Sequence, residues 1–368
     1  MSKTHVAFST LSDPSRAAAE LKQSFLGVEP SLVLFFASPA LPHAELAKEM
    51  KKAFPSAAVV GCTTSGELAA GRVLDQSVVA MALPRALVGE PHVEVIREPA
   101  SRSAIAQSFE AFERRVGAPM IALDYKQYVG LVLVDGLSGA EEALMEHIGD
   151  LTDVRFVGGS AGDDLKFQAT YVSADGEAHR GAAVLVLLKP AVPFDIIKTQ
   201  SFVATKHKLH ATKVDEARRL VLEFDGRPAA QAYADALGVP VEQLSTKFMS
   251  NPLGLMAEGE PFVRSPQRVT DEGVVFYCNV KEGLDFWVLE STDIVGETKK
   301  ALAKALGPAM PEALVNFNCI LRTLELKQKD QATAYGRVFA ELPMVGFSTY
   351  GEQLLGHINQ TATMLVLR

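Results

Sequence analysis

The chain has 368 residues, of which 48% are hydrophobic and 22% are charged. That composition is typical of a folded globular protein, and the length predicts about two domains. Because the formal net charge is −8, we do not expect nucleic-acid binding, which usually depends on a basic stripe on the protein surface.

Three cysteines, Cys62, Cys278 and Cys319, have no CxxC spacing and therefore predict neither a disulfide framework nor a zinc site. Unpaired thiols suit a reducing compartment. The N-terminal region has no apolar stretch of signal-peptide length. The longest apolar run, residues 182–188, is far shorter than the roughly 20 residues needed to cross a bilayer. We expect a cytoplasmic protein without membrane insertion and without a bound metal.

Apolar runs and helical spacings alternate along the first part of the chain. A short apolar run at 31–37 predicts a buried strand, and apolar side chains at helical spacing predict a helix over 41–54. Residues 57–60 are expected to form a second strand. Two more strands are predicted at 78–83 and 92–96, separated by a segment that contains Pro and Gly.

The same order of elements recurs further along the chain. A strand, an amphipathic helix and a strand are predicted at 128–134, 141–151 and 154–157. A hairpin between 169–173 and 181–188 is expected next, because Asp175-Gly176 is a strong turn pair.

The C-terminal part of the chain begins with a different pattern. A strand at 219–224 and a turn at Asp225-Gly226 are followed by a helix from Pro228 to Leu237, because proline is tolerated in the first helical turn. Strand-like runs then cover 314–326 and 357–367.

Three segments share one order of residue types: an apolar strand, a turn of small residues, an acid and a second strand. They are VVGCTTSGEL (59–68), FVGGSAGDDL (156–165) and MVGFSTYGEQL (344–354). Their irregular separations exclude a solenoid and indicate duplicated β-α-β-β units. The predicted fold class is α/β, of the α+β type, with mixed sheets flanked by helices and two domains that divide near 205–225.

The residue types of the three turns are compatible with two interpretations. Glycine and hydroxyl side chains are common in structural turns, so each turn taken alone fits a plain hairpin connection. Duplicated units can instead bring equivalent loops to one edge, where hydroxyls and turn amides would bind a carboxylate. The acids Glu67, Asp163 and Glu352 would then accept hydrogen bonds from an ammonium group, so an amino acid is the ligand hypothesis.

Arg322 and two residues of the last strand extend the predicted site. Arg322 is predicted on one face of a strand with Asn318, where it could hold a ligand carboxylate or form a structural ion pair with Glu352 or Glu325. Alternation along the last strand predicts that His357, Asn359 and Thr361 share a face. The predicted ligand-binding residues are Thr63, Thr64, Ser65, Glu67, Ser160, Asp163, Arg322, Ser348, Thr349, Tyr350, Glu352, His357 and Asn359.

Cys62 is the residue on which an enzymatic function would depend. A thiol in a glycine-flanked turn could act as a nucleophile if a base activated it. The equivalent positions of the other two turns are Gly159 and Phe347, so the thiol is not part of the repeated pattern. We therefore predict that the protein is not an enzyme, with a Cys62-dependent hydrolase as the least favoured alternative.

From about residue 30 to its end, the chain resembles the FIST family of prokaryotic sensory domains. The resemblance depends on the first two turns, on LEFDGRPAAQAY (222–233), on NCILR (318–322) and on GFSTYGEQLLGHINQT (346–361). It implies an N-type sensory domain with two internal repeats at 30–210 and a C-type domain at 211–368. It also implies a small-ligand input module for signal transduction, with amino acids suggested as ligands.

The resemblance further implies how a signal would leave the protein. The chain carries no attached kinase, cyclase or receptor region, so the output is expected to pass to a separate histidine kinase or cyclic-dinucleotide enzyme. Some FIST proteins bind haem and sense nitric oxide, which makes haem the alternative ligand. A haem ligand would have to be a histidine beside an apolar cavity, and the sequence does not choose among His43, His207, His210 and His357.

Overall fold

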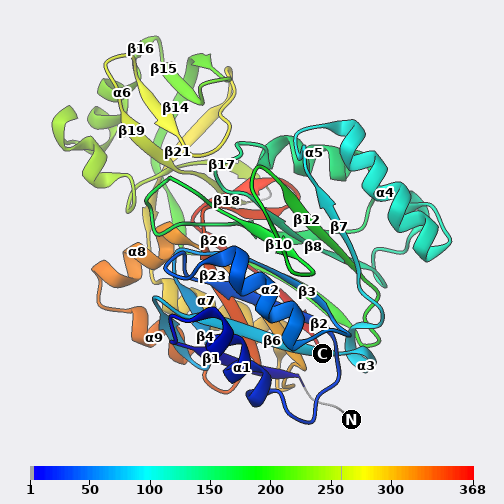
Figure 1. Cartoon of the computed structure of the whole chain (residues 1–368). Helices are drawn as coiled ribbons and strands as arrows, with labels where there is room; N and C mark the ends of the chain where they lie inside the picture. Colours follow the sequence, from blue (N-terminus) through cyan, green and yellow to red (C-terminus); the bar gives the residue numbers. More distant parts are fainter. Residues whose placement is uncertain (1–3, 258) are drawn as a thin grey trace. The chain divides into compact units, whose positions relative to one another are not determined.

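The computed structural model describes residues 4–257 and 259–368 of the chain (Figure 1). The chain forms two compact units. The first contains Met1–Thr199, Thr298–His357 and Ala362–Arg368, and the second contains Gln200–Glu297 and Ile358–Thr361. The predicted division into 30–210 and 211–368 concerns family modules and stays a prediction.

Three six-stranded sheets form the first unit, and all three have the same strand order. The first sheet consists of β1 (His5–Ser9), β6 (Val78–Pro84), β2 (Pro30–Ala37), β3 (Ala58–Thr63), β10 (Val172–Ala174) and β11 (Glu177–His179). The second consists of β7 (His92–Ile96), β12 (Ala183–Leu188), β8 (Val129–Val134), β9 (Phe156–Ser160), β24 (Glu352–Leu354) and β25 (His357–Ile358). The third consists of β13 (Phe194–Gln200), β26 (Thr361–Leu367), β22 (Ala313–Cys319), β23 (Met344–Thr349), β4 (Glu67–Ala69) and β5 (Arg72–Leu74).

The shared order shows that the first unit contains three copies of one motif. In each sheet the third and fourth strands of this order run parallel, as β2 and β3 do, and the flanking strands pair with them antiparallel. The predicted duplication of β-α-β-β units is therefore confirmed. The second unit enters the chain within the third copy, between β13 and β22.

Each copy gives its short hairpin to the sheet of another copy. The hairpin β4–β5 of the first copy pairs with β23, β10–β11 of the second pairs with β3, and β24 of the third pairs with β9. These exchanges form a closed cycle. The segments that lead into the hairpins are the three turns singled out in the sequence, so the exchange positions all three at the ends of the parallel strands.

The first glycine of each turn has a packing reason. A Cβ atom on Gly61, Gly158 or Gly346 would lie 2.3, 1.7 or 2.2 Å from a main-chain oxygen of the neighbouring parallel strand. Only glycine allows the two backbones to approach so closely. The recurrence of this residue therefore follows from sheet packing and does not require a ligand.

Helices cover the outer faces of the sheets, and the inner faces share one apolar core. The first copy carries α1 (Pro14–Ser24), α2 (His43–Ala53) and the short α3 (Arg85–Val88). The second carries α4 (Arg102–Val116), the 3-10 turn η1 (Met120–Ala122) and α5 (Glu141–Leu151). The third carries α7 (Ile294–Leu306), α8 (Ile320–Gln328) and α9 (Ala332–Arg337). In Figure 1, α1 lies beside α2 and α4 lies beside α5.

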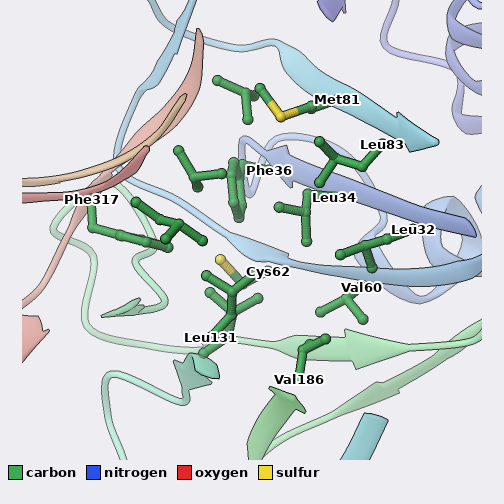
Figure 2. Packing of buried hydrophobic residues seen from close by; sticks show 14 of the residues in the cluster. Leu32, Leu34, Phe36, Val60, Cys62, Met81, Leu83, Leu131, Val186 and Phe317 are labelled. Atoms are coloured by element: carbon green, nitrogen blue, oxygen red, sulfur yellow. The ribbon is translucent and has the colours of Figure 1, made fainter. Parts of the chain in front are cut away.

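The shared core contains side chains from all three sheets. Figure 2 shows Leu34 and Phe36 of β2 in the same cluster as Leu131 of β8 and Phe317 of β22. Burial of these side chains is the main source of stability for the first unit, at roughly 25 cal/mol per Å² of apolar surface removed from water. A separate cluster lies under α1 and α2, where Leu21 packs with strand side chains such as Phe35.

The second unit is built around an eight-stranded antiparallel sheet. Its strands are β14 (Phe202–Asp215), β15 (Leu220–Phe224), β16 (Arg227–Pro228), β17 (Leu253–Ala257), β18 (Glu260–Arg264), β19 (Pro266–Val269), β20 (Val274–Phe276) and β21 (Asp285–Ser291). The helix α6 (Ala229–Leu237) and the 3-10 helix η2 (Val241–Lys247) accompany it. Its own core includes Phe224, Tyr233 and Phe286.

Several expected elements are confirmed, and three are wrong. The strand at 31–37, the helix at 141–151 and the helix that ends at Leu237 form as predicted. The hairpin around Asp175-Gly176 also forms, but its second arm is β11, because 183–188 pairs with β8 and β7 instead.

The other two errors concern the predicted site. Strand β22 ends at Cys319, so Arg322 lies in the first turn of α8 and not on a strand face beside Asn318. The last strand is interrupted at Gln360, where φ is +52°. His357, Asn359 and Thr361 therefore do not alternate along one continuous strand, because β25 ends at Ile358 and β26 begins at Thr361.

Candidate functional site

The three turns meet in the first unit and are joined by main-chain hydrogen bonds. Gly162 donates its amide to the Thr63 oxygen at 3.0 Å, which joins the second turn to the first. Ser65 donates to the Ser348 oxygen at 3.0 Å, which joins the first turn to the third. Tyr350 donates to the Ser160 oxygen at 3.2 Å, which closes the cycle. The expectation that equivalent loops come together is confirmed.

Glu67 is enclosed in this junction. Its side chain has no exposed surface, and it accepts hydrogen bonds from the Thr64 hydroxyl and from the amide and hydroxyl of Ser77, the last at 2.6 Å. Burial raises the pKa of Glu67 to about 7, although these hydrogen bonds act in the opposite direction. The carboxyl group therefore titrates near neutral pH.

Asp163 organises the segment that follows the second turn. Its carboxylate accepts hydrogen bonds from the amides of Phe167, Gln168 and Ala169 and from the Tyr350 hydroxyl. Burial acts to raise the pKa of Asp163, but these hydrogen bonds keep it below its ordinary value. Four donors occupy the carboxylate, so it holds the 163–169 segment against the third turn.

Buried polar contacts also surround the third turn. Glu352 has no exposed surface. The next residue, Gln353, donates from its side-chain Nε2 to the Ser160 hydroxyl at 3.1 Å. The same Nε2 atom lies 3.2 Å from Nδ1 of His357. The Thr349 hydroxyl donates to the Ser160 oxygen at 2.7 Å. This part of the junction is therefore a hydrogen-bonded network inside the protein.

Arg322 is 1% exposed and lies in a polar cluster behind the third turn. Its Nε donates to Asn318 Oδ1 and its Nη2 to Thr298 Oγ1, both at 3.0 Å. Asn318 donates in turn to Thr323, whose hydroxyl lies 2.7 Å from the hydroxyl of Ser348. The predicted ion pair with Glu352 or Glu325 does not occur among the described residues, where Glu325 pairs with Lys329 at 2.6 Å.

Cys62 lies in the shared apolar core and has no exposed surface. Figure 2 shows its side chain among Val60, Leu131 and Phe317. Burial, and then the nearby charge of Glu67, raises the pKa of the Cys62 thiol well above its ordinary value. A protonated thiol enclosed by apolar side chains is the environment of an unreactive structural cysteine.

A cavity of about 430 Å³ opens beside the junction, in the first unit. It lies where the parallel strands β2 and β3 end and α2 begins. Ligands of open α/β sheets bind at this kind of position, outside the carboxyl ends of the strands. Its lining residues are Pro39, Leu41, Pro42, His43, Ala44, Glu45, Thr63, Asp163, Lys166, Gln168, Ala169 and Tyr171.

His43 is the most unusual residue of this cavity. Its ring is stacked between Phe35 and Tyr171, with centroid distances of 5.7 and 6.0 Å. It is 5% exposed, and neither ring nitrogen has a hydrogen-bond partner among the described residues. Burial lowers the pKa of His43 to about 4, so the ring is neutral at pH 7. It therefore keeps one N–H donor and one acceptor nitrogen.

The structure places the predicted residues in three groups. Thr63 and Asp163 line the cavity. Asn359 belongs to the 358–361 segment of the second unit. The remaining ten are in the first unit, in or beside the junction: Thr64, Ser65, Glu67, Ser160, Arg322, Ser348, Thr349, Tyr350, Glu352 and His357. Sequence reasoning missed His43, Lys166 and Tyr171 as cavity residues, because none of them belongs to the repeated motif.

The four histidines named as candidate haem ligands lie in different surroundings. The His207 side chain is exposed, and His210 Nδ1 lies 2.8 Å from an Asp285 oxygen. The ring of His357 packs against Gly351. His43 borders a cavity whose wall carries Glu45, Asp163 and Lys166, whereas haem needs a wide apolar pocket.

Two further findings concern the described residues, 4–257 and 259–368. They contain no group of three or more His, Cys, Asp or Glu side chains arranged to hold a metal ion. None of their helices is both long enough and apolar enough to span a membrane.

Comparison with known proteins gives two matches to family models. Residues 31–227 match the FIST N domain, and residues 229–354 match the FIST C domain. Over 196 residues the chain is 26% identical to "Uncharacterized protein MJ1623" of Methanocaldococcus jannaschii. That match covers 49% of this chain and only 38% of the archaeal protein, so the chain spans less than two thirds of that relative.

The chain also has a weak similarity to solved structures. A cyanuric acid hydrolase from A. caulinodans aligns with a TM-score of 0.36 and 10% sequence identity, over 100% of this chain and 99% of that one. A likeness this weak supports no conclusion about the chemistry of this chain.

Proposed function

The chain belongs to the FIST family of sensory signal-transduction domains, and we propose that it senses a small polar zwitterion, such as an amino acid, and signals to a separate partner protein. The family predicted from the sequence motifs is confirmed. The ligand, the partner and the signalling step are parts of the proposal.

The cavity beside the turn junction is the observation that carries this proposal. Its volume of about 430 Å³ falls within the range of small-molecule pockets, roughly 300 to 1,000 Å³. Its lining offers both charges that a zwitterion needs, because the Lys166 ammonium and the Glu45 carboxylate both belong to it. His43 and Thr63 supply neutral polar groups. The inferred site therefore lies next to the predicted turns and includes Thr63 from them.

The predicted acids have different roles in this proposal. Glu67 and Asp163 already accept several hydrogen bonds from the protein, so we assign them to holding the junction and the 163–169 segment in place. The rim residue Glu45 is the acid that would accept from the ligand ammonium. Arg322 does not line the cavity, and we assign it to supporting Asn318 and the third turn.

The 163–169 segment is the part of the site that would transmit a signal. It supplies one wall of the cavity and is tied to the third turn through the contact between Asp163 and Tyr350. A ligand that prefers one position of this segment would shift its population, by no more than the difference in affinity between the two positions. A histidine kinase or a cyclic-dinucleotide enzyme is the expected reader of that change.

Two alternatives have less support. A haem-based nitric-oxide sensor would need a histidine beside an apolar cavity, whereas the lining beside His43 includes Glu45, Asp163 and Lys166. A Cys62-dependent hydrolase would need an accessible thiolate, and the Cys62 side chain is enclosed in the apolar core. An absorbance spectrum after haem addition tests the first alternative, and we expect no Soret band.

Isothermal titration of the full chain with each of the twenty amino acids tests the proposal. We expect saturable heat with one-to-one stoichiometry from at least one of them. Heat from none of the twenty would overturn the amino-acid assignment, and a Soret band with one haem per chain would favour the haem alternative.

A further inference from the structure

The start of α2 faces the cavity without a capping side chain. Pro42 is the N-cap residue and provides no side-chain hydrogen bond, and the first helical hydrogen bond is donated by Leu46 to the Pro42 oxygen at 3.0 Å. The first-turn residues His43, Ala44 and Glu45 all line the cavity. Amides of a first helical turn have no partner within the helix, and the helix dipole favours an anion beside them.

His43 is an independent observation at the same place. It is a 95% buried polar side chain, since 5% of it is exposed, and both of its ring nitrogens lack a partner among the described residues. A buried polar group without a hydrogen bond costs about 1 to 3 kcal/mol. A bound polar molecule that reaches the ring nitrogens would remove that cost, and His43 belongs to the cavity lining.

In the second copy of the motif, a side chain of the protein occupies the place that corresponds to this cavity, between the start of the helix and the end of the strand. Ser160 ends β9 at the position that Thr63 occupies in β3, and Glu141 begins α5 as His43 begins α2. The buried carboxylate of Glu141 accepts a hydrogen bond from the Ser160 hydroxyl at 3.3 Å. The second copy therefore places a carboxylate of the protein itself between the helix start and the strand hydroxyl.

The first copy has the same hydroxyl, but no carboxylate among the described residues accepts from it, although Glu45 and Asp163 also belong to the cavity lining. Thr63 Oγ1 accepts from the Tyr171 amide at 3.0 Å, and its O–H has no acceptor among the described residues. The helix begins with the neutral His43 instead of a glutamate. Lys166 adds a cation to the cavity lining.

We propose that the cavity is a carboxylate-binding site, in which the ligand carboxylate takes the place that Glu141 fills in the second copy. The carboxylate accepts hydrogen bonds from the first-turn amides of α2 and from the Thr63 hydroxyl, and it is neutralised by Lys166. A second polar group of the ligand pairs with His43. This inference rests on the proposed sensor function and specifies the ligand class: a small organic acid with a further hydrogen-bonding group, of which an amino acid is one example.

The first test varies the ligand. The full chain is titrated calorimetrically with the amino acid that binds best, with its carboxamide, and with the carboxylic acid that lacks the amine. We expect the carboxamide to bind at least tenfold more weakly, because it has lost the charge recognised by α2 and Lys166. Equal affinity for the amino acid and its carboxamide would overturn the carboxylate site and leave the sensor proposal standing.

The second test varies the protein. Lys166→Gln is expected to weaken binding about tenfold, and Lys48→Gln, on the exposed face of α2 outside the cavity, by less than twofold. His43→Phe keeps the ring stack but removes both nitrogens. We expect it to weaken binding about tenfold, while the melting temperature of the ligand-free protein stays equal or rises because an unpaired buried polar group is removed. If binding in Lys166→Gln and His43→Phe equals that of the wild type, the site is elsewhere.

The two proposals fail in different ways. If no amino acid binds but acetate or a larger organic acid does, with affinity that depends on Lys166, the carboxylate site stands and the amino-acid assignment falls. If amino acids bind independently of Lys166 and of their carboxylate, the sensor stands and the carboxylate site falls. If neither class binds, both proposals are rejected.

Discussion

The hydroxyl groups of Thr63 and Ser160 occupy equivalent positions in two copies of one motif, and their surroundings differ. Ser160 lies between Glu141 and Gln353, so its hydroxyl both donates and accepts within the protein. Thr63 borders a cavity of about 430 Å³. In the third copy, the hydroxyl of Ser348 pairs with Thr323. In the second and third copies, side chains of the protein therefore contact this hydroxyl, whereas in the first copy the hydroxyl borders a cavity.

This difference indicates that the residues repeated in all three copies maintain the fold, whereas other residues form the cavity. Glycine, hydroxyl and acid recur because each turn must bring two backbones together and hold an exchanged hairpin. The residues that make the first copy different, such as His43 and Lys166, lie outside the repeated pattern. Substitutions that act on the common framework should therefore affect stability, and substitutions in the cavity should affect binding.

Gly158→Ala should have the largest effect, because it disrupts what the three copies share. The new Cβ would lie 1.7 Å from the Val132 oxygen, on a strand backbone that cannot move without breaking the sheet. We expect the free energy of unfolding to fall by about 3 kcal/mol or more. Urea denaturation followed by circular dichroism measures it.

Gly149→Ala is the matched control for that substitution. Gly149 lies inside α5, and nothing lies within 4 Å of the position of its Cβ. Alanine should stabilise the helix by up to about 1 kcal/mol. A Gly158→Ala variant as stable as Gly149→Ala would contradict the packing explanation for the recurring glycine.

Arg322→Ala should act on stability and not on ligand affinity. The substitution removes hydrogen bonds to Asn318 and Thr298 and leaves a void behind the third turn. We expect a loss of about 3 kcal/mol in the free energy of unfolding. Because Arg322 does not line the cavity, affinity for the ligand should change less than twofold in calorimetry at a temperature where the variant is folded. A large loss of ligand affinity in Arg322→Ala would show that Arg322 contributes to the binding site.

Glu67→Gln should remove a pH dependence of stability. The folded protein holds the Glu67 proton up to about pH 7, whereas an unfolded glutamate loses it near pH 4.3. Between those values the folded state binds more protons than the unfolded state, so this group makes stability fall as the pH rises through that window. The glutamine variant should gain about 2 to 3 kcal/mol relative to the wild type between pH 5 and pH 8.

Urea denaturation at several pH values measures that gain. Glu110→Gln is the control, because Glu110 is on the exposed surface of α4 and 65% of its side chain is accessible. A difference between the Glu67→Gln variant and the wild type that stays constant with pH would show that Glu67 is ionised in the folded protein.

The sequence predicted the three copies of the motif, but it did not predict how the copies contact one another. Glycine, hydroxyl and acid after an apolar strand are local signals, and they located all three turns. The exchange of hairpins could not be predicted, because a three-residue strand such as β4 does not specify which sheet it joins. Its partner β23 lies far along the chain and is chosen by the closure of the whole unit.

The errors at the candidate site have equally physical causes. The strand β22 passes directly into α8, whose N-cap Cys319 provides no capping side-chain hydrogen bond, so no capping signal marks the boundary before Arg322. From the sequence, His43 is only a candidate haem ligand, because a single histidine at the start of a helix gives no signal for a cavity. Its significance depends on Phe35 and Tyr171, which the fold brings to both faces of the ring.

Thr63→Val and Ser348→Ala test the comparison of the copies at the smallest scale. Each removes one hydroxyl from equivalent strand positions, and each should cost about 1 kcal/mol of stability through a lost hydrogen bond. Only Thr63 borders the cavity, so Thr63→Val should also weaken ligand binding about fivefold, whereas Ser348→Ala should leave it unchanged. Calorimetric titration and urea denaturation of both variants separate the two effects. If both variants lose affinity equally, the first and third copies contribute alike to one site. The proposed functional difference between these copies would then be rejected.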